Sequence, residues 1–245
     1  MATVAEHYEY LLADYYSWMF GDFAGKVETH HRFFSVNQIQ PTKSGLAMDL
    51  GAGPGFQSIP LAQLGFRVLA VDLSLRLLEE LHCRCGNLPI TPIHGDLMDF
   101  AAWGEAPIEL CVCMGDTLPH LPDFESVTLL LEQVYRSLEP GGRLVLSFRD
   151  LSLELHGTDR FIPVRSDADT VFTCFLEYES HYVTVHDLLY TLKEAWELRK
   201  STYRKIRISP AWIVEQLEKA GFLMEMAENM NGMITVIARK PVVSR

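Results

Sequence analysis

Hydrophobic and polar positions divide the chain into short apolar runs and longer amphipathic stretches. The runs Leu46–Leu50, Arg67–Val71 and Ile108–Cys113 are short and mostly apolar, which is typical of strands buried in a parallel sheet. Between them, apolar residues recur at three- and four-residue steps, and this spacing predicts helices. The alternation of the two patterns indicates an α/β fold.

The first apolar run ends in a turn that is rich in glycine. Gly51, Gly53 and Gly55 alternate there with Ala52 and Pro54, so that few side chains shield the main chain from a ligand. The helix that begins just after this turn directs unpaired N–H groups toward whatever binds there. The sequence therefore predicts a ligand site at the turn.

An acidic residue marks the end of the second strand. Asp72 follows the first glycine by about 20 residues, which is where nucleoside-binding α/β folds place a carboxylate for ribose hydroxyls. A dinucleotide site needs the spacing G-x-G-x-x-G, but Phe56 takes the place of its third glycine. The observed spacing, G-x-G-x-G, counts against NAD or FAD as the ligand.

From Asp49 to Gly55 the chain resembles the first motif of the class I S-adenosylmethionine-dependent methyltransferases, which is an acid, one residue and then G-x-G-x-G. Further segments resemble later motifs of that family in the same order, including Pro-Gly-Gly at residues 140–142. The resemblance is specific for residues 45–150 and weaker for 210–240. It implies a Rossmann-like seven-stranded α/β sheet and S-adenosyl-L-methionine as the cofactor.

The same resemblance implies roles for individual residues. Asp96, directly after the third strand, would accept a hydrogen bond from the adenine amino group, with Leu73 and Leu97 on the two faces of the base. The backbone near Met114 and Gly115 would contact the methionine part. The expected cofactor-binding residues are Asp49, Gly51, Ala52, Gly53, Pro54, Gly55, Asp72, Leu73, Asp96, Leu97, Met114 and Gly115.

Residues 1–40 precede the first strand and have a helical pattern. Tyr8, Tyr15 and Phe20 belong to a series of apolar positions with acidic residues between them. In methyltransferases that resemble this chain, such a segment closes over the cofactor as a lid and helps to wall the substrate pocket. An aromatic stripe at helical spacing is equally typical of an ordinary core, so both interpretations stay open.

A second addition separates the fifth strand from the last helix. The runs Val171–Tyr178, Tyr182–Leu192 and Trp196–Ile208 have strand-like content and short connections, which predicts an antiparallel β meander within residues 158–209. We expect one domain over residues 1–245. Its parts are the helical lid 1–40, the cofactor-binding core 45–150, the β insertion 158–209, and the last helix and strands 210–240.

In methyl transfer the acceptor attacks a sulfonium methyl group that is already activated, so the protein's main tasks are to align the acceptor and to exclude water. A hydroxyl or ammonium acceptor also needs a base, and His120 is the first candidate because histidine titrates near neutrality. The alternative is a surface histidine with no role, and His181 and His186 are weaker candidates. The family resemblance implies that Asp116 meets the substrate. Arg149, Arg160 and Arg165 could hold an acidic substrate by bidentate pairing, but surface or structural roles explain these arginines at least as well.

Composition narrows the class of partner. The net charge of −11 argues against nucleic acid, and the basic cluster Arg199–Arg207 is explained as well by the solvated side of a strand. No apolar run is long enough for a membrane span, and the first residues do not form a secretory signal. We expect a cytoplasmic protein without a metal site, since the five cysteines form no zinc framework; a homodimer is an expected assembly.

The predicted function is S-adenosylmethionine-dependent methyl transfer to nitrogen or oxygen of a small molecule. One alternative is a catalytically silent module that binds the cofactor and regulates a partner. Another is a nucleotide-dependent oxidoreductase, which the glycine spacing disfavours. Cofactor binding without transfer to any metabolite would favour the silent module.

Overall fold

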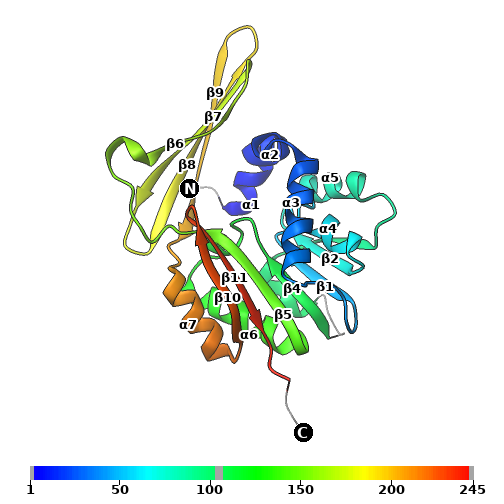
Figure 1. Cartoon of the computed structure of the whole chain (residues 1–245). Helices are drawn as coiled ribbons and strands as arrows, with labels where there is room; N and C mark the ends of the chain where they lie inside the picture. The colour runs from blue at the N-terminus through cyan, green and yellow to red at the C-terminus, as the bar shows by residue number, and fades with distance from the viewer. Residues whose placement is uncertain (1–2, 103–106, 243–245) are drawn as a thin grey trace.

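The computed structural model describes residues 3–102 and 107–242 (Figure 1). Its main sheet has the strand order β10-β11-β5-β4-β1-β2-β3, and only the pairs that include β11 are antiparallel. The seven strands are β1 (Leu46–Leu50), β2 (Arg67–Asp72), β3 (Ile90–His94), β4 (Ile108–Cys113), β5 (Leu138–Arg149), β10 (Leu223–Met230) and β11 (Met233–Arg239). The predicted Rossmann-like seven-stranded methyltransferase sheet is confirmed, with β3 at its edge.

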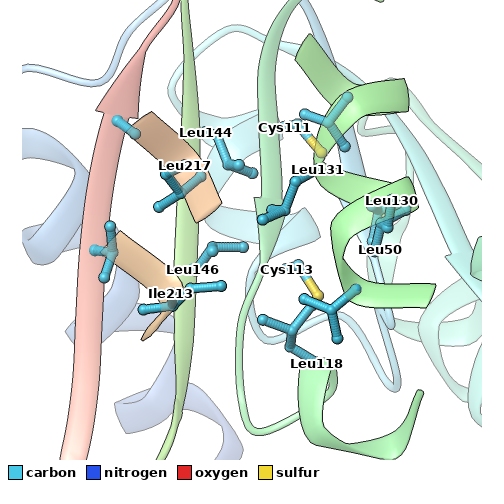
Figure 2. Close-up of a cluster of buried hydrophobic side chains, with 14 of the residues drawn as sticks. Leu50, Cys111, Cys113, Leu118, Leu130, Leu131, Leu144, Leu146, Ile213 and Leu217 are labelled. Carbon is cyan, nitrogen blue, oxygen red and sulfur yellow. The ribbon is translucent and has the colours of Figure 1, made fainter. Parts of the chain in front are cut away.

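Helices cover both faces of this sheet because successive strand residues point to opposite sides. Cys111 and Cys113 face one side, where Figure 2 shows them close to leucines of α6, while Leu110 and Val112 belong to the cluster on the other side. The helices of the core are α4 (Ser58–Gln63), α5 (Leu75–Cys85), α6 (Phe124–Ser137) and α7 (Pro210–Ala220).

Strand β5 is longer than the sequence predicted. The sequence after Pro-Gly-Gly predicts a strand over residues 143–148. The observed strand begins at Leu138, because Leu138 pairs with Ile108 and the Pro-Gly-Gly segment joins the sheet. There the Gly141 N–H donates to the Lys240 carbonyl at 2.9 Å. Residues that form a turn in the local pattern are thus drawn into the sheet by a partner about 100 residues away in the chain.

The N-terminal segment is helical but is not one helix. It consists of α1 (Val4–His7), a π-helical turn (Tyr8–Leu12), α2 (Ala13–Phe20) and α3 (Phe23–Val36). Gly21, at φ +82°, ends α2, because glycine adopts the left-handed region without steric cost. In the part of the chain that the structure describes, no helix is long and apolar enough to cross a membrane.

The insertion forms a separate antiparallel sheet of four strands, β6 (Phe161–Ser166), β7 (Thr170–Tyr178), β8 (Tyr182–Leu192) and β9 (Trp196–Ile206). The sequence predicted three of them and missed β6. Pro163 interrupts β6 and its register with β7 shifts there, which suits an edge strand and hides the strand in the local pattern. Figure 1 shows the β8–β9 hairpin extending well beyond the main sheet.

The N-terminal helices pack against the second sheet. Leu11 and Leu12 share a buried cluster with Phe172 and Leu189, from β7 and β8. Each such side chain contributes about 1.5–3 kcal/mol when it leaves water. The helices α1 and α2 are therefore fixed to the insertion at the end of the main sheet where the carboxyl ends of its parallel strands meet.

Candidate cofactor and acceptor site

Asp72 is held against the glycine turn. Its Oδ2 accepts from the Gly53 N–H and its Oδ1 from the Ser74 N–H, both at 2.8 Å. Burial raises the pKa of this carboxyl, and the two N–H donors oppose that rise. Each oxygen keeps a lone pair for a further donor, as a carboxylate that binds ribose hydroxyls requires.

Asp49 lies at the end of β1, beneath the same turn. It is only 1% exposed, and its Oδ2 accepts from Ser58 Oγ at 2.6 Å. Its Oδ1 is buried and has no hydrogen-bond partner in the described part of the chain. Burial raises the pKa of Asp49 to about 7, so this carboxyl is sensitive to any donor or charge that reaches the turn.

A hollow of about 580 Å³ opens at the carboxyl ends of the strands. Its floor contains six of the expected cofactor-binding residues, namely Gly51, Gly53, Asp72, Leu73, Asp96 and Leu97. Tyr8 and Tyr16 of the N-terminal segment line it as well, together with His120, and Tyr182 and Arg204 contribute from the insertion. One continuous space therefore joins the predicted adenosine site to the candidate base.

A second hollow of about 260 Å³ lies on the other side of the glycine turn. Its lining includes Ala52, Pro54, Met114 and Gly115 from the expected set, and Lys26, Thr29 and His30 from α3. Tyr16 borders both hollows. The N-terminal segment thus contacts both parts of the space in which the sequence places the cofactor.

Two of the expected cofactor residues line neither hollow. Asp49 is buried below the turn, as described above. Gly55 has φ +99°, and a side chain there would collide with Leu81 of α5. In this structure the glycine at position 55 permits close packing of the turn on a helix, a reason that spacing alone does not distinguish from ligand contact.

The loop after β4 is fixed by several hydrogen bonds. Asp116 adopts φ +78°, a conformation that costs a residue other than glycine about 1–3 kcal/mol. Its Oδ1 accepts from the Arg149 N–H at 2.9 Å, and its Oδ2 pairs with Lys205 Nζ. The Gly115 N–H donates to Ser147 Oγ at 3.0 Å. Both carboxylate oxygens of Asp116 are therefore engaged within the protein.

Asp116 and Arg149, both predicted to act on the substrate, do not line either hollow. Asp116 is buried, whereas Arg149 is exposed and uses its backbone N–H to hold Asp116. The structure thus brings His120 to the first hollow and places these other two residues beside the loop that carries it.

His120 lies in a cage of aromatic rings. It stacks on Tyr203 at 5.2 Å between ring centroids and meets Tyr8 edge-on at 5.9 Å. Its Nδ1 is enclosed and has no hydrogen-bond partner among the described residues. Burial, then the nearby charges of Lys205 and His7, lower the pKa of His120 well below its usual value. The imidazole is therefore neutral at pH 7 and can accept a proton.

The neighbouring tyrosines are not alternative bases. Burial raises the pKa values of Tyr8, Tyr16 and Tyr203, and nearby carboxylates raise them further. These phenols stay protonated near neutrality, so they can donate hydrogen bonds but cannot take a proton.

Sequence reasoning missed Lys26, His30 and Lys205. The two residues of α3 carry no motif. Lys205 belongs to the basic cluster near the end of β9, whose side-chain alternation places it on the same strand face as Tyr203. That alternation beside an aromatic residue was the available signal.

The family match falls within the cofactor-binding core that the sequence predicts, residues 45–150. Residues 47–142 match the family described as methyltransferase domain. A cypemycin N-terminal methyltransferase from Streptomyces sp. is 29% identical over 115 residues, 47% of this chain and 46% of that protein. A ubiquinone biosynthesis O-methyltransferase of Proteus mirabilis is 28% identical over 134 residues, 51% of this chain and 53% of that protein. The chain spans about half the length of these curated relatives.

Solved structures extend the likeness to nearly the whole fold. The CcbJ methyltransferase from Streptomyces caelestis has a TM-score of 0.73 at 21% identity and covers 87% of this chain and 95% of that chain. CalS10, an amino pentose methyltransferase from Micromonospora echinaspora solved with S-adenosylmethionine bound, has a TM-score of 0.71 at 14% identity, over 91% and 93%. At such identities the likeness shows the fold alone.

The match over residues 47–142 and the seven-stranded sheet agree with the resemblance to S-adenosylmethionine-dependent methyltransferases that the glycine motif indicated.

Proposed function

We propose that the protein transfers a methyl group from S-adenosyl-L-methionine to nitrogen or oxygen of a small molecule. The observation that carries this proposal is the first hollow, which runs without interruption from the expected adenosine residues to His120 beneath the N-terminal helices. A site for nucleoside binding alone would not need a neutral base at its far end.

The donor groups of the site fit the cofactor. Asp72 offers carboxylate oxygens at the place for ribose, and Leu73 and Leu97 offer apolar faces for a base. The amino-acid end suits the second hollow, where Lys26 can pair with a carboxylate and the turn supplies backbone groups. When bound, S-adenosylmethionine supplies an activated methyl on a sulfonium centre.

The protein's own contribution is alignment, exclusion of water and removal of a proton. The neutral imidazole of His120 would take the proton from an acceptor hydroxyl as the new bond to carbon forms, or from an acceptor ammonium group before its nitrogen attacks. Tyr8 and Tyr16 would close the space over the reacting atoms. Asp116 would act by holding the loop, since both of its oxygens are already engaged.

The comparisons support a small acceptor. The ubiquinone biosynthesis enzyme is named as an O-methyltransferase, and KedS8 from Streptoalloteichus sp., another protein of this fold, is described as a sugar N-methyltransferase. Oxygen and nitrogen acceptors therefore both occur among proteins that are similar to this chain. The net charge of −11 agrees with an acceptor that is not a nucleic acid.

Calorimetry and thermal melting with S-adenosylmethionine, its demethylated product and NAD test the proposal. At 100 times its dissociation constant a ligand adds about 2.7 kcal/mol to stability, and we expect this from the first two compounds only. Stabilisation by NAD alone would overturn the assignment. Incubation of methyl-labelled cofactor with a metabolite extract then separates an enzyme from a silent binding module, in which the label never leaves the cofactor.

A further inference from the structure

Strand β9 of the insertion reaches the β4 loop with two side chains of one face. Tyr203 stacks on His120, and Lys205 pairs with Asp116. The side chains of Lys205 and Asp116 are each only 11% exposed. Two segments that are about 90 residues apart in the sequence are thus joined by a nearly buried ion pair beside the acceptor end of the hollow.

We propose that Lys205 is a positioning residue of the acceptor site, which holds the loop Met114–His120 in the geometry that presents His120 to the acceptor. This inference rests on the proposed function and adds to it a residue outside every family motif. It also gives a role to one residue of the basic strand β9, in a chain that is strongly acidic as a whole.

The backbone of Asp116 shows why the loop needs such a partner. Its φ of +78° is disfavoured for a residue with a side chain. Three contacts oppose relaxation: the Asp116 N–H donates to the Ser147 carbonyl at 3.1 Å, the Arg149 N–H donates to Oδ1, and Lys205 pairs with Oδ2. Only the last of these is a counter-ion, and a buried carboxylate without one is strongly destabilising.

Lys205 also acts on the charge of His120. The ionisable groups that face this imidazole are Lys205 and Tyr203 from β9, His7 and Tyr8 from the N-terminal segment, and Asp116 from its own loop. His7 is itself paired with Asp187 of β8 at 3.0 Å. A fixed cation beside His120 disfavours a second positive charge, so the ring enters the reaction neutral, with one nitrogen able to accept a proton.

Proton NMR of the histidine rings tests the proposal without any acceptor. Lys205→Met should move the titration of His120 to higher pH, with the signal assigned by its absence in His120→Gln. Lys205→Arg, which keeps the cation, should restore the wild-type titration. Lys200→Met is the matched control, because Lys200 is exposed on the opposite face of the same strand. An unchanged His120 titration in Lys205→Met would overturn the inference.

Loss of the pair leaves Asp116 buried without its cation, so Lys205→Met can lose stability. The double variant Asp116→Asn with Lys205→Met removes both charges of the pair and should regain stability, with the titration of His120 shifted back toward that of the wild type. Once an acceptor is known, Lys205→Met should lower turnover by about 10- to 100-fold with little change in cofactor affinity. Absence of cofactor binding in the wild type would refute the proposed function instead, and the NMR comparison would still decide the role of Lys205.

Discussion

The glycine-turn half of the site and the acceptor half are built in opposite ways. The turn, Asp72 and Ser74 lie within 25 residues of one another, and their hydrogen bonds join neighbours in one β-α-β unit. The acceptor half gathers Tyr8, His120 and Tyr203 from three distant parts of the chain. The first half is local and carries a motif, whereas the second depends on the packing of two additions to the sheet.

This difference teaches where specificity can change. The local half requires particular spacings, because its donors are backbone groups fixed by glycine dihedrals. The acceptor half requires only that side chains of suitable shape and charge meet across a packed interface. On the proposed function, substitutions in the insertion can therefore alter the acceptor while cofactor binding is preserved.

Removal of residues 1–20 should have the largest effect, because it separates turnover from cofactor binding. The deletion takes away Tyr8 and Tyr16, and we expect turnover to be abolished while the main sheet stays folded and binds cofactor with reduced affinity. Calorimetry and circular dichroism check the second part. Because the deletion also uncovers Phe172 and Leu189, Tyr16→Ala in the full chain is a companion variant. Turnover at an undiminished rate would show that the pocket lies elsewhere.

Replacement of the candidate base gives the next largest effect. His120→Gln should lower the rate by about 100- to 10,000-fold with an acceptor that must lose a proton, without loss of cofactor affinity. His156→Gln is the control, since His156 is exposed in the segment before β6. Equal rates for the two variants would mean that the acceptor is deprotonated without help from His120.

Asp72→Ala tests the local half. A charge-assisted hydrogen bond is worth about 1.5–3 kcal/mol, so we expect cofactor affinity to fall by about 10- to 150-fold. Calorimetry measures this change, and Glu79→Ala on the exposed side of α5 is the control. A folded Asp72→Ala protein with unchanged affinity would show that another group serves the ribose.

A last expected effect, which leaves catalysis aside, is a pH dependence of stability that originates from Asp49. Its pKa is about 7 in the folded chain against an ordinary value of 3.8, so between these values the folded state holds a proton that the unfolded state has lost. The free energy of unfolding should fall by up to about 1.4 kcal/mol per pH unit as pH rises through this window. Denaturant unfolding of Asp49→Asn should lack this component, and an identical pH slope in both proteins would contradict it.

The sequence was most informative where contacts are local. The strand Leu46–Leu50, the turn after it and Asp72 were predicted at their observed places, because apolar runs, glycine spacing and strand ends are all visible within 30 residues. The seven-stranded sheet was implied by the family resemblance that these motifs carry. The positions of Asp96 and Leu97 on the hollow were predicted from the resemblance of the third-strand end.

Predictions were weaker where contacts between distant parts of the chain determine the structure. Strand β6 was missed because an edge strand with a proline has little local signal, and β5 was drawn too short because its first pairs are made across the sheet. The π-helical turn and Gly21 divide what the periodicity presented as one helical stretch. The partner of Asp116 could not be foreseen, since Lys205 meets it only after the insertion has packed.

The position of Tyr16 in the N-terminal segment determines the order of events that we expect in a catalytic cycle. Tyr16 borders both hollows, so a ligand that spans the glycine turn must pass beneath this ring, whereas an acceptor needs access to the first hollow alone. We therefore expect a compulsory sequence in steady-state kinetics, with the cofactor arriving first and its demethylated form departing last. Inhibition by the demethylated cofactor would then be competitive with respect to S-adenosylmethionine and noncompetitive with respect to the acceptor.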